Sequence, residues 1–150
     1  MRFSWFVVAV CAAAAMLFAG SVSAQRRSHA RGDSREALTL SPAEAAEMLS
    51  GMRTYLETVQ GIVSALAENK VARVPEIAAR SGAKLLGSMN PITGLKAPIG
   101  FTMMSLDTHD KFDKLAEKAR RGTSRTEVLT DLQDILGNCT GCHAAYRLAR

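Results

Sequence analysis

Residues 41–69 read SPAEAAEMLSGMRTYLETVQGIVSALAEN, and this stretch predicts one long helix. Ser41 stands at the expected N-cap, Pro42 at the first helical position and Glu44 at the third, where its carboxylate can accept a hydrogen bond from the cap amide. Apolar residues then recur every three or four positions, which puts them on one face of the helix. That face carries Met48, Met52, Tyr55, Leu56, Val59, Ile62, Val63 and Leu66.

Three further helices are expected after the first. One should run over residues 75–89, where Pro75 opens a helical pattern, and a loop rich in proline and glycine should follow over 90–100. The third helix should begin at about Phe101 or Met103 and end near residue 121. The fourth should begin at a second capping box, Ser124 to Glu127. Because no stretch alternates with period two, the fold class is all-α, an antiparallel four-helix bundle, in which cofactor sites form between facing helices.

The first 24 residues have the three-part form of a secretory signal peptide. Arg2 supplies the positive charge, residues 5–19 form an apolar run, and residues 20–24 are small residues suited to signal peptidase. A retained membrane helix is the alternative, but the run is shorter than the roughly 20 residues that a bilayer requires. We therefore expect cleavage before Gln25, a periplasmic location in a bacterium and no membrane anchor in the mature chain.

The mature chain is expected to be one small domain with a short leader. Residues 25–40 are rich in Arg, Ser, Gly and Asp and predict a disordered leader, whereas residues 41–150 predict the helical domain. Without Arg2, 18 basic residues remain against 14 acidic ones, a net charge of +4. This excess is too small to indicate a nucleic-acid partner, for which a clustered basic stripe is expected.

The residues that carry the chemistry lie near the C-terminus. Cleavage removes Cys11 and leaves Cys139 and Cys142, which stand in the sequence Cys139-Thr140-Gly141-Cys142-His143. This C-x-x-C-H signature is that of covalent c-type haem attachment. Two cysteines three positions apart can each form a thioether to one edge of a porphyrin, and His143 can then ligate the iron.

Three alternatives explain the cysteine pair less well. A redox-active C-x-x-C belongs at a helix N-terminus in a βαβ setting, and this chain offers no strands. Zinc needs about four ligands, and only His29 and His109 could join the cluster. A simple disulfide explains neither His143 nor the expected position of both cysteines on the buried face of the fourth helix.

The last residues resemble a known family. The run from Cys139 to Arg147, CTGCHAAYR, is similar to the C-x-x-C-H-x-x-[Tyr/Phe]-Arg ending of the cytochrome c-prime family and its low-spin relatives. Over residues 41–137 the resemblance is one of helix order and length only. It implies a four-helix bundle with one covalent haem, Tyr146 packed beside the haem and Arg147 neutralising a propionate. Taken alone, Tyr146 is equally explained as core filling and Arg147 as a solvated charge near a helix C-terminus.

The group opposite His143 decides what the haem does. The low-spin relatives take a methionine from the first helix, where this chain offers Met48 and Met52, and alignment of the helix ends favours Met52. His109 on the third helix is a competing ligand, although we expect it to be partly exposed and paired with a carboxylate or a propionate. Met103 and Met104 rank below, because they begin the third helix beside the loop.

Two functions remain open at this point. With Met52 bound to iron, the protein would be a six-coordinate one-electron carrier that serves a redox partner protein. With an open sixth position, it would be a five-coordinate haem protein of the c-prime type that binds nitric oxide or carbon monoxide. An enzyme is not expected, since no distal acid or base and no second cofactor motif can be identified. The resemblance also makes a homodimer possible, because the family commonly pairs through its first two helices.

Overall fold

The first long helix, α2 (Pro42–Ala67), begins at the capping box that the sequence predicts. In the computed structural model, which describes residues 32–88 and 91–149 (backbone only at 91 and 92), the Glu44 amide donates to Ser41 Oγ at 3.3 Å. The Ser41 amide donates in turn to Glu44 Oε2 at 2.8 Å. The helix ends two residues before Asn69, whose φ of 57° takes the backbone out of the helical conformation. The expected signal peptide, residues 1–24, lies outside the described residues.

The segment expected to form one helix over residues 75–89 is broken into short pieces. After η1 (Val71–Arg73), which precedes the segment, the pieces are α3 (Val74–Ala78), η2 (Ala79–Ser81) and α4 (Ala83–Leu86). The break falls at Gly82, whose backbone is extended, and the Ala83 amide donates to Asp113 Oδ2 at 2.8 Å. A Cβ at Gly82 would overlap the Asp113 carboxylate. The single-helix prediction is therefore wrong, because a tertiary contact with another helix turns the chain there.

The remaining helices follow the predicted order. A short helix, α5 (Pro91–Lys96), lies within the expected loop, and α6 (Ile99–Arg120) begins earlier than Phe101. The chain turns at Gly122, whose φ of 90° suits glycine, and α7 (Arg125–Ala145) begins at the second predicted capping box. The described chain is thus mostly helical, which confirms the all-α class. Among the described residues, no helix is both long and apolar enough to cross a membrane.

Two short strands lie at the ends of the unit Arg35–Arg150, to which all these elements belong. Strand β1 (Glu36–Leu38) pairs in parallel with β2 (Tyr146–Leu148), with Glu36 opposite Tyr146. The expectation of a leader without structure to residue 40 is therefore wrong at residues 36–38, and Tyr146 lies in β2 rather than on the helix that carries the cysteines. A strand of three residues is too short to show a period-two pattern, and its partner lies more than 100 positions away, so the sequence does not predict this pairing.

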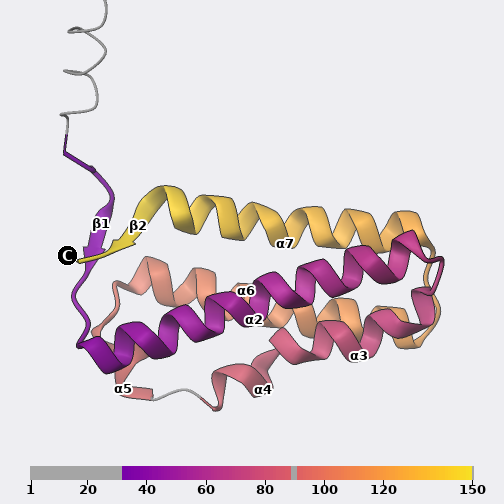
Figure 1. Cartoon of the computed structure of the whole chain (residues 1–150), viewed down its shortest axis with the longest axis horizontal. Helices are drawn as coiled ribbons and strands as arrows, with labels where there is room; N and C mark the ends of the chain where they lie inside the picture. Colours follow the sequence, from indigo (N-terminus) through magenta and orange to yellow (C-terminus); the bar gives the residue numbers. More distant parts are fainter. Residues whose placement is uncertain (1–31, 89–90, 150) are drawn as a thin grey trace, which may run out of the picture. The chain divides into compact units, whose positions relative to one another are not determined.

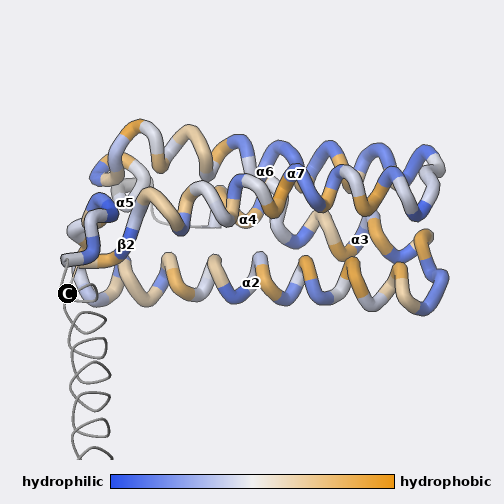
Figure 2. The backbone as a smooth tube through the Cα atoms, turned by 90° about the horizontal axis from the view of Figure 1, so that it is seen from above, coloured by the Kyte–Doolittle hydropathy of each residue, from blue (hydrophilic) through white to orange (hydrophobic). Residues whose placement is uncertain are grey.

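The packed core occupies one half of the unit. Helices α2, α6 and α7 run lengthwise in the unit; α6 packs against α7, and α3 contacts both α2 and α6 (Figures 1 and 2). The core side chains come from the C-terminal halves of α2 and α6, from α3 and from the N-terminal half of α7. Among the core side chains that are less than 2% exposed, the largest are Ile62, Val74, Phe112, Leu115, Val128 and Ile135. The other half of the same three long helices contributes none of the core cluster, and the site lies there.

Candidate functional site

A cavity of about 410 Å³ lies between α2, α6 and α7 in the half of the unit without the core cluster. Its walls come from α2 between positions 49 and 59, from α6 between 101 and 108, and from α7 between 136 and 143. We call this space the first cavity. It is of the size and apolar character of small-molecule and cofactor sites, which measure roughly 300–1,000 Å³.

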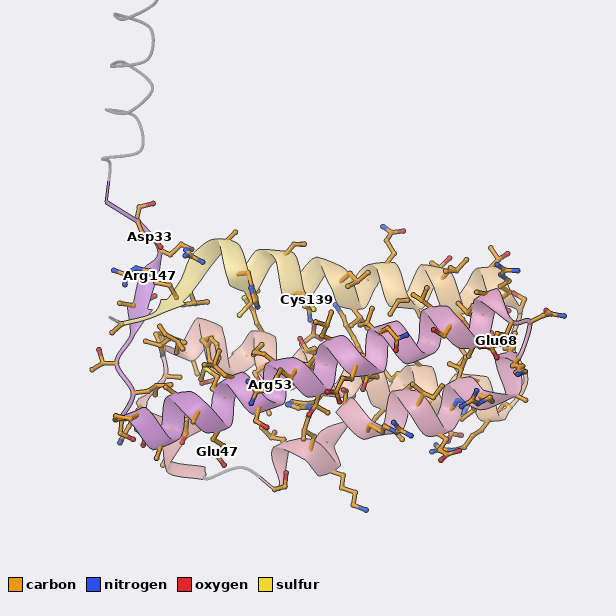
Figure 3. The ribbon with its side chains drawn as sticks, in the orientation of Figure 1. Asp33, Glu47, Arg53, Glu68, Cys139 and Arg147 are labelled. Carbon is orange, nitrogen blue, oxygen red and sulfur yellow. The ribbon has the colours of Figure 1, made fainter. Side chains whose placement is uncertain are left out.

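The two cysteines and the histidine of the C-x-x-C-H motif line the first cavity. Helix α7 continues to Ala145, so Cys139 and Cys142 lie one turn apart on one face, and both are half-buried. His143 also contributes to the lining and is exposed. Figure 3 shows Cys139 on α7 and Arg53 on α2 at the same level along the two helices. The motif therefore faces a space large enough to hold a cofactor.

The two thiols lack the lowered pKa of a redox-active pair. They are not joined in a disulfide. Burial raises the pKa of the Cys139 thiol and, together with the charge of its neighbour, the pKa of the Cys142 thiol. A redox-active pair needs the opposite shift, since the thiolate is the nucleophile. The raised pKa values of the two thiols therefore argue against a redox-active pair.

Exposed leucines border the first cavity. Leu49, Leu56 and Leu136 line it, yet they are 45%, 69% and 39% exposed. Leu49 and Leu56 lie seven positions apart on α2, which places them on the same face of that helix. Large apolar side chains grouped around a hollow indicate an apolar occupant.

The methionines differ in their relation to this space. Met52 is half-buried and lines the first cavity together with the cysteines, whereas Met48 is buried and does not line it. Both lie against a second cavity of about 420 Å³, between α2, α6 and the segment from α4 to α5. On α6, Met103 is 58% exposed, but Met104 lines the first cavity. Among the methionines that the structure describes, Met52 and Met104 thus share a cavity with His143.

His109 does not have the environment expected of it. It is 2% exposed, and its ring nitrogens are hydrogen-bonded to neutral groups, not to a carboxylate. Nδ1 donates to the Ser81 carbonyl at 2.8 Å, with the Gly82 carbonyl at 3.1 Å, which assigns the proton to Nδ1. Nε2 then accepts from the Tyr55 hydroxyl at 2.7 Å. The prediction of a partly exposed, carboxylate-paired histidine is wrong, because α4 and its flanking turn cover this face of α6.

Tyr55 is a site residue that the sequence analysis did not single out as such. It lines both cavities, and its ring stacks on Phe112 at 5.8 Å between centroids. Burial raises the pKa of the Tyr55 hydroxyl far above its ordinary value, so the group remains a neutral donor. Its place on the apolar stripe of α2 was visible in the sequence, but its partner His109 was not.

Tyr146 and Arg147 lie in β2, beyond the end of α7. The ring of Tyr146 packs edge-on against Phe101 with centroids 5.5 Å apart, and Phe101 in turn lines both cavities. Arg147 is half-buried and lines neither cavity. The arginine that does line the first cavity is Arg53, which directly follows Met52 in α2. Sequence reasoning missed Arg53, because an exposed arginine on a helix carries no signal of its own.

Comparisons of the chain with protein-family models, with curated proteins and with solved structures gave no match. Within the part of the chain that the structure describes, no group of three or more His, Cys, Asp or Glu side chains could hold a metal ion by itself. The functional conclusion therefore depends on the C-x-x-C-H motif and on the cavity that it faces.

Proposed function

We propose that this protein is an exported monohaem c-type cytochrome that carries single electrons. The observation that supports the proposal best is the coincidence of two features. Cys139, Cys142 and His143 form the haem-attachment signature, and all three line an apolar cavity in the half of the unit that lacks the core cluster.

The residues around the first cavity fit a haem. The half-buried thiols of Cys139 and Cys142 would hold it covalently, and its apolar faces would cover Leu49, Leu56 and Leu136. His143 supplies a nitrogen ligand and Met52 a soft thioether, a ligand pair that favours a high reduction potential. When bound, the group supplies a reversible one-electron couple at iron.

Arg53 and Tyr55 have separate tasks in this proposal. Arg53 lines the first cavity and is exposed, so its guanidinium can neutralise a propionate at the cavity edge while remaining in water. The resemblance assigns this task to Arg147, which lines neither cavity. Tyr55 stays neutral and keeps its hydroxyl on His109.

The fold and location belong to the same proposal. With a haem in the first cavity, α2, the segment from α3 to α4, α6 and α7 form an antiparallel four-helix bundle like that of the cytochrome c-prime family and its low-spin relatives. Residues 1–24 act as the signal peptide, and the mature protein works in the periplasm with a redox partner protein and without catalytic activity of its own. Pairing of two copies is compatible with this role.

The second cavity favours one alternative function. It shares Met52, Tyr55, Phe101 and Ser105 with the first cavity. If Met52 swings into this space, the sixth position opens and its surroundings are apolar. The protein would then bind nitric oxide or carbon monoxide at a five-coordinate haem, as the c-prime family does.

Expression of the full chain in a host that matures c-type cytochromes tests the proposal. The purified protein should be red, should keep its haem under denaturing electrophoresis, and should have the mass of residues 25–150 plus one haem. The reduced spectrum should be that of a low-spin c-type cytochrome. Replacement of both Cys139 and Cys142 by alanine should abolish attachment. Thr140→Ala is the matched control, since Thr140 lies between the cysteines but lines neither cavity.

Two results would decide against it. A colourless wild-type protein with two intact cysteines, made under conditions that mature a control cytochrome, would remove the haem from the proposal altogether. A covalent haem with a high-spin spectrum that binds carbon monoxide in the wild-type protein would replace the electron carrier with the gas-binding alternative.

A further inference from the structure

The chain just before the first helix touches the residue that the proposed function makes the iron ligand. Arg35 immediately precedes β1, and its Nη1 donates to the carbonyl oxygen of His143 at 3.1 Å. The same nitrogen lies 3.5 Å from the carbonyl oxygen of Tyr146. The contact spans 108 positions in the sequence, so it is a tertiary contact made when β1 pairs with β2.

This contact completes the end of α7. The last carbonyls of a helix have no intrahelical partner. At the end of α7 the Tyr146 amide donates to the Cys142 carbonyl, and Arg35 donates to the carbonyl of His143, the next residue. A cation at a helix C-terminus is also favourable to the helix dipole. Arg35 is therefore a C-terminal capping group supplied from the other end of the domain.

The strand behind Arg35 is itself fixed. Leu38 is 4% exposed, and its carbonyl accepts a hydrogen bond from the Ala149 amide at 3.0 Å. Together with the register of Glu36 opposite Tyr146, this holds β1 along the residues that follow His143. We call Arg35 with β1 the N-terminal clasp. It restrains the backbone on which the imidazole of His143 is mounted.

We propose that Arg35 is a positioning residue for His143, and that the N-terminal clasp thereby sets the orientation of the imidazole relative to the haem. The inference rests on the proposed function. Arg35 touches the backbone of the ligand residue and acts on the iron only through it. Loosening the clasp should leave the haem attached, since Cys139 and Cys142 hold it covalently, but should broaden the range of His143 orientations.

The test uses the mature holoprotein and four versions of it: wild type, Arg35→Ala, Arg35→Lys and Arg121→Ala. Arg121→Ala is the matched control, because it removes one exposed arginine from the end of α6, where its partner is Glu117. Amide hydrogen exchange should speed up about tenfold over residues 146–149 in Arg35→Ala, as expected for loss of a charge-assisted hydrogen bond. Arg35→Lys keeps the positive charge and a hydrogen-bond donor group at the side-chain end, and should restore part of the protection.

The readout at the iron separates positioning from plain structural support. In Arg35→Ala the electron paramagnetic resonance signal of the low-spin ferric iron should broaden, and the reduction potential of the haem should shift. Arg121→Ala should match the wild-type protein in both measurements. Faster exchange with an unchanged iron signal and an unchanged potential would overturn the proposal and leave the clasp as a structural feature. Unchanged exchange would overturn it as well. Failure of the wild-type protein to attach haem would instead refute the proposed function, so the two failures are distinguishable. If Arg35→Ala does not accumulate, the lysine variant decides by the same two measurements.

Discussion

At the scale of single residues, the proposed site depends on which side chains reach the space beside Cys139 and Cys142. Met52 does so and Met48 does not, although the two lie one turn apart on the same helix. Met48 instead lines only the second cavity, which lies between α2, α6 and the segment from α4 to α5. From the sequence, the choice of Met52 over Met48 depended only on the alignment of helix ends. The first cavity adds a spatial reason, because Met52 shares it with His143 and Met48 does not.

We predict that Met52→Ala converts the iron from low-spin to high-spin and opens it to carbon monoxide. The reason is loss of the thioether that shares a cavity with His143. Met48→Ala should keep the low-spin spectrum but lower the free energy of unfolding by about 2–5 kcal/mol, because Met48 is only 7% exposed. Absorption spectra and denaturant titration measure the two effects. If Met104→Ala alone changes the spin state, the ligand comes from α6 and the assignment to α2 is wrong.

A second residue-scale prediction concerns the buried pair of Tyr55 and His109. Tyr55→Phe removes the donor to Nε2 of a histidine that is 2% exposed, and should lower the free energy of unfolding by about 1–3 kcal/mol. Tyr146→Phe is the control, because the Tyr146 hydroxyl makes no hydrogen bond within the described residues and its ring contact with Phe101 remains. Equal losses in the two variants, measured by denaturant unfolding, would mean that the hydrogen bond adds nothing.

At the scale of the elements, the sequence predicted helix starts better than helix interruptions. Both capping boxes mark the observed beginnings of α2 and α7. They could be predicted because a capping box depends only on four adjacent residues. The break at Gly82 depends on Asp113, 31 positions away, and β1 depends on a partner at the other end of the domain. The hydrogen bond between His109 and Ser81 escaped prediction for the same reason. Features that depend on adjacent residues could thus be predicted from the sequence, and features that depend on tertiary contacts could not.

The start of α2 should respond to acid. Glu44 accepts from Ser41 and from Lys96 Nζ, 2.6 Å away, and these bonds, with that of Lys96 foremost, lower its pKa to about 2. Since its pKa is lower in the folded protein than the ordinary 4.5, Glu44 stabilises the fold above pH 4.5 and progressively less as the pH falls to about 2. In Glu44→Gln the free energy of unfolding should therefore fall less steeply over this window.

Lys96→Met provides the matched test, because it removes the partner and leaves the carboxylate. It should also flatten the dependence on pH, although less than Glu44→Gln, since the bonds to Ser41 remain. Glu127 caps α7 in the same way and has a pKa of about 2, so part of the acid sensitivity should survive in both variants. A pH dependence identical to wild type in both would show that the ion pair does not form in solution.

At the scale of the whole molecule, the helical unit is packed at one end and hollow at the other. The core cluster draws on positions 62–66 of α2, 112–119 of α6 and 128–135 of α7, whereas the two cavities lie against earlier positions of α2 and α6 and later positions of α7. Helices of this length gain most of their stability from burial of an apolar face. The hollow half therefore needs an occupant to be as stable as the packed half.

We predict that the protein without haem keeps its packed half and loses order in the other. Replacing Cys139 and Cys142 by alanine should lower the helical content and leave amide protection concentrated in the C-terminal halves of α2 and α6 and the N-terminal half of α7, where the core cluster lies. Addition of haem to the wild-type protein during maturation should raise protection in the remaining halves, because its faces would cover side chains such as Leu56, now 69% exposed. Circular dichroism and residue-resolved hydrogen exchange measure both states. Uniform protection along all three helices in the cysteine-free variant would show that the hollow half is stable by itself, and the first cavity would then not be a cofactor site.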